Sequence, residues 1–262
     1  MIQPVVIGAG LVGWQFLQNT YDRQLESFTQ SPELKRDIDH FEEKIGSVFT
    51  AEALVSDRQL LRVALGAFGL DDDIDNRFFI QKMLEEGTTA DDALANRFTD
   101  TRYRDLSEAF GFGPSEIPQT FQAGFAAEIV EKFKANSFEI ATGEQDENMR
   151  IALYAQRTLS EVVSTEGSDA QKWFSIMGQP PLRQLFETAF NLPDQFGSVD
   201  IDQQLGVFEE RAEREFGTSD PGIFSDPEAV EDLVRTYLAR AQVRDLSTGQ
   251  SSGSIALQLL QA

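Results

Sequence analysis

The chain has 262 residues, no cysteine, one histidine and a formal net charge of −22 at pH 7. The lack of cysteine excludes disulfides and thiolate metal sites, and one histidine cannot form a histidine dyad or a multi-histidine metal site. The negative charge disfavours nucleic-acid phosphates and anionic membranes as partners. It would attract a basic protein, and it is also an ordinary route to solubility.

Residues 1–13 contain glycines at positions 8, 10 and 13, which match the spacing of a dinucleotide-binding fingerprint. That fingerprint belongs between a strand and a helix, in a sheet built from further buried strands. No such strands follow, because the next residues have the spacing of helices. We therefore predict that 1–13 is a flexible N-terminal arm and that the chain binds no cofactor.

Residues 14–113 are predicted to form an N-terminal helical part. Its first helix carries apolar residues at a spacing of three and four from Trp14 to Phe28, and a second helix starts at Pro32. His40 lies off the apolar stripe of this second helix, so a surface position is expected. The acidic run that starts at Asp71 resembles a calcium loop, but Lys82 stands where the last acidic ligand should be. We expect that run to cap a helix instead of binding a metal.

Short helix starts and stops recur along the chain. Asp57 and Asp100 follow Ser or Thr at two predicted helix starts, since a carboxylate accepts hydrogen bonds from the first helical turn. Gly69 and Gly111 follow Ala-Phe at two predicted helix stops, where a left-handed residue ends the helix. Asn191 occupies the same place in a third stop, because Asn also tolerates this conformation.

The stop at Phe68 recurs at Phe190 and the start at Phe98 recurs at Phe224, at nearly equal separations along the chain. This regularity favours two degenerate helical repeats, at about residues 55–113 and 180–243. The alternative is that every helical protein shares such caps and that no duplication took place. The residues between the caps match poorly, so both interpretations stay open.

Residues 111–119 gather glycine and proline and are predicted to separate the N-terminal part from a C-terminal helical part at 114–243. Thr120 is expected to cap the next helix, in which Phe121 and Phe125 would begin a buried seam. Residues 244–262 read as a flexible linker followed by an apolar tail. The sequence as a whole predicts an all-α, multihelical fold of about ten to twelve helices.

No motif of catalysis is present in the sequence. It contains neither a nucleophile elbow nor a phosphate-binding loop, and its 44 acidic residues form carboxylate pairs by chance throughout. Di-metal carboxylate bundles need more than one histidine. We therefore expect a protein that is not an enzyme, with a carboxylate-based enzyme as an alternative.

Several long motifs lie between about Trp14 and Gln242, at 65–72, 79–80, 84–88, 93–97, 109–113, 143–150, 172–174 and 177–183. Together they resemble a bacterial domain of unknown function, number twelve-seventeen. The resemblance implies a gene within a flagellar gene cluster, and some family members carry a flagellar basal-body or rod label. It implies no enzymatic role, and no catalytic residue can be transferred.

The resemblance and the lack of catalytic motifs lead to one expected function, with an alternative. We expect a non-enzymatic protein that acts in flagellar assembly or motility by protein contacts, with flagellar proteins or a second copy as partners and no small molecule. It would lie in the cytoplasm, or in the basal body if exported without a cleaved signal. The alternative is a cytoplasmic chaperone or regulator of an exported flagellar subunit. An interaction patch is expected at Glu144, Gln145, Asp146, Trp173 and Phe174.

Overall fold

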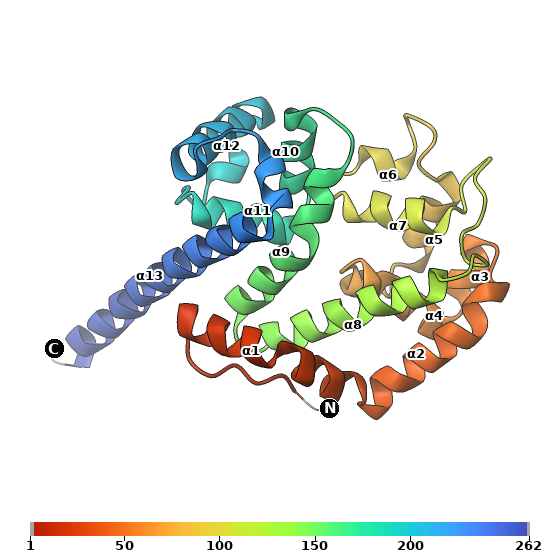
Figure 1. The fold of residues 1–262 in the computed structure, drawn as a ribbon, viewed down its shortest axis with the longest axis horizontal. Coiled ribbons are helices and arrows are strands. Elements are labelled where there is room, and N and C mark those ends of the chain that lie inside the picture. Colours follow the sequence, from red (N-terminus) through yellow and green to blue (C-terminus); the bar gives the residue numbers. More distant parts are fainter. Residues whose placement is uncertain (1–2, 261–262) are drawn as a thin grey trace. The chain divides into compact units, whose positions relative to one another are not determined.

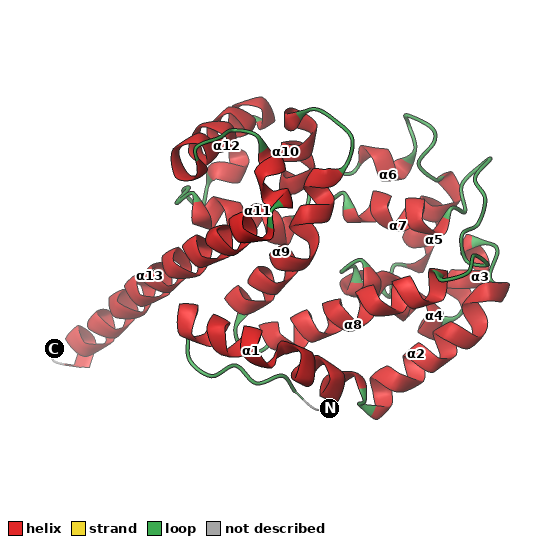
Figure 2. Ribbon diagram, in the orientation of Figure 1, coloured by secondary structure: helices red, strands yellow, loops and turns green. Residues whose placement is uncertain are grey.

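The computed structural model describes residues 3–260, with side chains described for residues 3–245. Over this range every regular element is a helix, which confirms the all-α prediction (Figures 1 and 2). The α-helices are α1 Gly10–Thr29, α2 Pro32–Lys44, α3 Ala51–Ser56, α4 Arg58–Ala67, α5 Arg77–Glu86, α6 Leu94–Arg97, α7 Arg102–Phe110, α8 Phe125–Gly143, α9 Glu147–Ser164, α10 Asp169–Met177, α11 Pro180–Ala189, α12 Ile201–Phe216 and α13 Pro227–Leu260. Short 3₁₀ turns are η1 Ile45–Ser47, η2 Asp71–Asp73, η3 Phe196–Ser198 and η4 Pro221–Ser225.

The chain forms two compact units. The first contains the residues up to Val5 together with Thr20–Thr142, and the second contains Val6–Asn19 and the residues from Gly143 onward. Helix α1 therefore contributes residues 10–19 to the second unit and residues 20–29 to the first. The predicted boundary between 113 and 114 is wrong, because it falls inside the first unit.

Contacts across the Gly- and Pro-rich segment explain why it does not separate two domains. Phe110 at the end of α7 packs edge-on against Phe125 at the start of α8, with ring centroids 5.2 Å apart. The backbone N–H of Gln119 also donates to the Phe110 carbonyl at 3.0 Å. The segment is therefore a folded connection between two helices that share one core.

The core of the first unit depends on close approach between α8 and its neighbours. Tyr21 and Phe28 of α1 meet the ring of Phe138 edge-on, at centroid distances of 5.2 and 5.7 Å. In α4, a Cβ at Gly66 would lie 2.6 Å from the ring of Phe133. A residue without a side chain at this position lets α8 pack directly against the α4 backbone.

The core of the second unit is a cluster of aromatic rings. Trp173 of α10 is fully buried and meets Phe186, Phe208 and Phe224 edge-on. Around this cluster α9 packs against α11 and α13, and α11 packs against α13. Edge-to-face pairs add to the stabilisation that burial of the rings provides.

Both ends of the chain differ from the sequence prediction. Helix α1 begins at Gly10, within the predicted flexible arm, and Val5 exchanges hydrogen bonds with Gln24 at 2.6 and 3.0 Å. The glycines of the arm form the tight start of α1, where a Cβ at Gly13 would lie 2.6 Å from the Gly8 carbonyl oxygen. The predicted linker is helical, since α13 continues to Leu260. Serine and glycine weaken a helix without blocking it as proline does.

Aspartate side chains cap the helix starts. Six of them accept the backbone N–H of the residue two positions later: Asp57, Asp100, Asp146, Asp200, Asp220 and Asp226. Three of the six lie outside the starts from which a duplication was inferred. The caps alone therefore do not distinguish a duplication from ordinary helix chemistry, and the internal repeat stays a prediction.

Candidate interaction surface

The predicted interaction patch divides into two separate parts. Glu144 and Gln145 are exposed in the turn before α9, and Asp146 caps α9 by accepting from the N–H groups of Asn148 and Met149. Trp173 and Phe174 belong to α10, which follows the far end of α9. The two groups therefore belong to different elements, the turn before α9 and the middle of α10.

Trp173 does not belong to any surface patch. Its side chain has an exposed fraction of 0%, and its indole N–H donates to the Ser219 carbonyl at 2.9 Å. Phe174 is only partly exposed. The prediction of a patch that includes Trp173 is wrong, because the indole fills the aromatic core and has its hydrogen-bond partner there.

Gly69 and Asn191 adopt the same helix ending. Their φ angles are +70° and +51°, both in the left-handed region. Leu70 N–H donates to the Leu65 carbonyl at 3.0 Å, and Leu192 N–H donates to the Glu187 carbonyl at 2.8 Å. These are Schellman bonds that satisfy the last carbonyls of α4 and α11. Gly111 has φ +62° and ends α7 with a bond to the Ser107 carbonyl.

An arginine binds the carbonyl at each Schellman turn. Arg102 of α7 donates to the Gly69 carbonyl and also pairs with Asp100 at 2.7 Å. Arg244 of α13 donates to the Leu192 carbonyl at 2.6 Å. A cation at a helix C-terminus opposes the negative end of the helix dipole. These stops are therefore fastened to later helices of their own units.

Replacing Gly69 with valine should lower the free energy of unfolding by about 1 kcal/mol or more, because a β-branched residue disfavours a left-handed backbone. Its Cβ would also lie 3.3 Å from Arg102 Nη1. The matched control is Asn191→Gly, which exchanges two residues that both accept this conformation and should be nearly neutral. Urea unfolding measures both, and equal stabilities for Gly69→Val and the parent chain would contradict the helix-stop assignment.

The acidic run after α4 serves the fold. Asn136 of α8 donates to Asp71 Oδ2 at 3.1 Å, Tyr103 donates to Asp73 and Arg58 pairs with Asp75 at 2.7 Å. Within the described part of the chain, no group of three or more His, Cys, Asp or Glu side chains is placed to hold a metal ion. The run therefore ties α4, α7 and α8 together.

Burial raises the pKa of Asp71, with a further contribution from Asp72, while the Asn136 hydrogen bond and Arg102 oppose the increase. The folded chain thus holds this proton more tightly than the unfolded chain, so Asp71 lowers stability as the pH rises above the ordinary value near 4. We expect Asp71→Asn to gain stability relative to the parent chain between pH 4 and pH 7. A stability difference that is the same at both pH values in thermal unfolding would contradict this.

His40 supports a helix cap. Its Nε2 lies 2.7 Å from Asp57 Oδ2, and the other oxygen of Asp57 accepts the first N–H groups of α4. Burial raises the pKa of Asp57, but the hydrogen bonds from His40, Leu60 and Gln59 outweigh it and leave the pKa lowered. The histidine is therefore partnered at the junction of α2 and α4, and the sequence pattern gave no sign of this partner.

Two large exposed apolar side chains lie on the connection before α8, and one of them meets a third on the loop before α3. Ile117 and Phe121 are 65% and 55% exposed, and Phe121 meets Phe49, which is 53% exposed, at a centroid distance of 6.3 Å. We call these three residues the apolar loop surface. The sequence placed Phe121 in a buried helical seam, and that is wrong because α8 begins only at Phe125.

The predicted helix start at Thr120 does not form, and the reason is local. Gly124 has φ +93°, which interrupts a right-handed helix, and Thr120 donates its hydroxyl to the Val48 carbonyl instead of capping a helix. A glycine within the predicted helix was the signal that could have separated Phe121 from the seam.

The loop that carries this surface is fixed to the first unit by a close backbone contact. A Cβ on Gly113 would lie 2.5 Å from the Cα of Gly87, so both positions require glycine. The carboxylate of Glu116 accepts the N–H groups of Thr88 and Gly113 at 3.0 and 3.1 Å. Ile117 follows this anchor directly and is held outward by it.

A groove of about 440 Å³ adjoins the apolar loop surface. It lies between the end of α7, the loop before α8 and the first turns of α8. Its lining is Glu108, Ala109, Gln119, Gln122, Ala123, Gly124, Phe125, Glu128 and Ile129. Gln119 also donates to the Ile117 carbonyl, so the groove and the surface share one loop. We call it the acidic groove, because its two charged residues are both glutamates.

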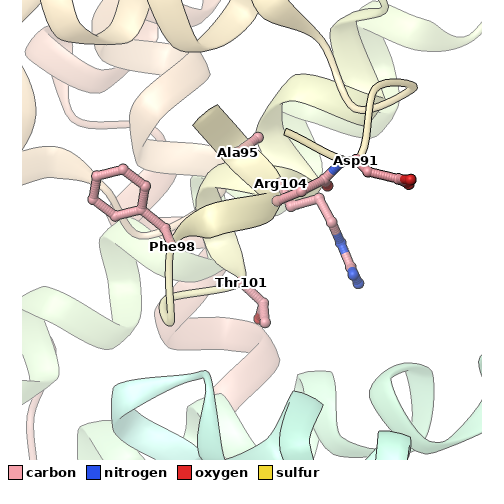
Figure 3. Close-up of a pocket in the computed structure, with 6 residues that line it drawn as sticks. Asp91, Ala95, Phe98, Thr101 and Arg104 are labelled. Atoms are coloured by element: carbon pink, nitrogen blue, oxygen red, sulfur yellow. The ribbon is translucent and has the colours of Figure 1, made fainter. Parts of the chain in front are cut away.

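In two other hollows the lining side chains do not point toward a common centre. The pocket in Figure 3 measures about 210 Å³, and Phe98 points away from Asp91 and Arg104, so these side chains do not converge on one point. A hollow in the second unit, of about 450 Å³, is lined by residues of α1 and α13. There the indole of the buried Trp14 already donates to Glu231 at 3.3 Å. Neither presents a catalytic arrangement.

The fold is similar to that of a solved bacterial protein. The crystal structure of protein AGR_C_984 from Agrobacterium tumefaciens matches with a TM-score of 0.76 and 24% sequence identity, over 92% of this chain and 97% of that chain. No protein of curated function matches this chain. Residues 67–230 match the model of a family described as protein of unknown function (DUF1217). The chain therefore belongs to the DUF1217 family.

Proposed function

We propose that this protein is not an enzyme and acts by binding other proteins in flagellar assembly or motility, as a component associated with the basal body or rod. The apolar loop surface carries the protein-binding part of this proposal. Three large apolar side chains, each more than half exposed, lie on two loops. Glu116 anchors the loop of Ile117 and Phe121, and the Thr120 hydroxyl joins that loop to the carbonyl of Val48, next to Phe49. Exposed apolar groups gathered beside a groove are typical of protein-binding sites.

The bonding of the charged residues supports a binding role over a catalytic one. Asp71 and Asp73 bind Asn136 and Tyr103, and Asp57 caps α4. Such partners hold elements together, whereas a catalytic carboxylate has to face a cleft that admits substrate. The acidic groove is open and contains no nucleophile–base pair, which suits recognition of a side chain.

The flagellar setting rests on the family resemblance, whose motifs imply a gene within a flagellar cluster. A cytoplasmic chaperone or regulator of an exported subunit is the second candidate, and the acidic groove favours it because a groove can hold one face of a partner helix. None of the helices in the described part of the chain is long and apolar enough to cross a membrane.

Fractionation of motile cells tests this proposal. Basal bodies and cytosol are separated, and the protein is followed in each fraction with its co-purifying proteins. Recovery with rod or hook proteins would support the basal-body role, and recovery in cytosol with one flagellar subunit would support the chaperone. Recovery without flagellar proteins, together with normal swimming after deletion of the gene, would contradict both and lead to a search for enzymatic activity.

A further inference from the structure

We infer that the acidic groove and the apolar loop surface together bind a segment of a partner protein in which bulky apolar side chains alternate with lysine or arginine. This inference rests on the proposed protein-binding function and names the chemistry of the partner. The main observation behind it is that an apolar surface lies beside a groove whose only charged lining residues are two glutamates.

The groove offers an apolar lining to an anchor side chain. This lining consists of Phe125 and Ile129, which are 8% and 1% exposed, together with Ala109 and Ala123. A volume of about 440 Å³ is near the lower end for ligand pockets, so it suits one or two bulky side chains. The apolar loop surface provides further contact for neighbouring apolar residues of the same segment.

The charged lining favours a cation beside that anchor. The carboxylate of Glu108 makes no hydrogen bond or ion pair within the described part of the chain, and the carboxylate of Glu128 pairs with Lys132 at 3.1 Å. No lysine or arginine lines the groove. A lysine or arginine from a partner would therefore find an unpaired and exposed carboxylate at Glu108, beside the apolar lining of the groove.

The charge of the whole molecule favours a basic partner over a second copy. Two copies of a chain with net charge −22 repel each other, whereas a basic segment is attracted over a long range. Complementary charge also increases the association rate more than it increases affinity. We therefore expect binding that weakens steeply as salt is added.

The test uses the full chain and a fluorescent amphipathic peptide of leucine and lysine as the probe, followed by fluorescence anisotropy. A matched peptide replaces every lysine with glutamate. We expect Glu108→Gln combined with Glu128→Gln to weaken binding by about fivefold, and Phe121→Ser to weaken it by about tenfold. The glutamate peptide should not bind.

Two matched control variants separate this site from general attraction to an acidic protein. Glu166→Gln combined with Glu213→Gln removes two exposed charges, as the groove variant does, and Phe78→Ser removes a phenylalanine that is 81% exposed and does not line the groove. Both should bind the peptide within about twofold of the parent chain. An equal loss in the control and groove variants would overturn the inference, because the binding would then reflect net charge alone.

Two further outcomes would also overturn the inference. The first is unchanged peptide binding by the groove variants. If flagellar proteins still co-purified with the chain in that case, the proposed function would stand but would use another surface. The second is a dimer of the parent chain that Phe121→Ser dissociates, because it would assign the surface to a second copy. Specific peptide binding without flagellar partners would support the inference and contradict the flagellar setting.

Discussion

Replacing Trp173 with alanine is expected to lower the free energy of unfolding by about 3–5 kcal/mol, the range for removing a large buried aromatic side chain. The indole has an exposed fraction of 0% and meets three phenylalanine rings edge-on. Its removal leaves a cavity between α10, α11 and α12, and the Ser219 carbonyl loses its donor. Urea unfolding followed by circular dichroism measures this loss.

Trp173→Phe provides the control for this variant. It keeps an aromatic ring in the cluster and removes the hydrogen bond to Ser219 at 2.9 Å. The loss should be about 1–2 kcal/mol, since the hydrogen bond is removed and the smaller ring leaves part of the buried indole site unfilled. A surface tryptophan would give a change below about 0.5 kcal/mol in both variants. That result would mean that Trp173 lies on the surface, and it would contradict the aromatic core of the second unit.

Gly113→Ala is expected to lower the free energy of unfolding by about 2–3 kcal/mol, near the upper end for inserting a methyl group into a packed site. The new Cβ would lie 2.5 Å from the Cα of Gly87 and 2.8 Å from the Glu116 carboxylate. Two backbones would have to separate, and Glu116 would lose its bonds to Thr88 and Gly113. Because this contact anchors the loop, the variant should also weaken peptide binding.

Gly206→Ala is the matched control for this substitution. A Cβ at Gly206 has no neighbour within 4 Å, and the residue lies within α12. Alanine there should raise stability by about 0.5–1 kcal/mol, because glycine is a poor residue for a helix interior. Equal effects of the two substitutions would mean that the Gly87–Gly113 contact does not constrain the loop.

Local chemistry explains why much of the fold could be predicted from the sequence. Aspartate at a helix start and glycine at a helix stop act through their own backbone neighbours, so Asp57 and Gly69 could be assigned without tertiary information. The count of about ten to twelve helices agrees with the eleven α-helices of at least seven residues in the described part of the chain. Periodicity identified these helices because each buries one face.

Long-range packing explains what could not be predicted. The sequence showed Trp173 as an aromatic residue in a specific motif, but its burial depends on Phe208 and Phe224, which come from distant elements. The unit boundary at residue 143 was missed because Phe110 and Phe125 pack across the Gly- and Pro-rich segment. Phe121 fitted a helical spacing of four, and only the backbone at Gly124 removes it from the helix.

Affinity purification from motile cells, comparing the parent chain with Phe121→Ser and Phe78→Ser, tests whether the apolar loop surface binds flagellar proteins. We predict that flagellar proteins are recovered with the parent chain and with Phe78→Ser, and that Phe121→Ser loses them while keeping its helical content and stability. Equal recovery of the same proteins by all three chains would contradict a role for the apolar loop surface in binding.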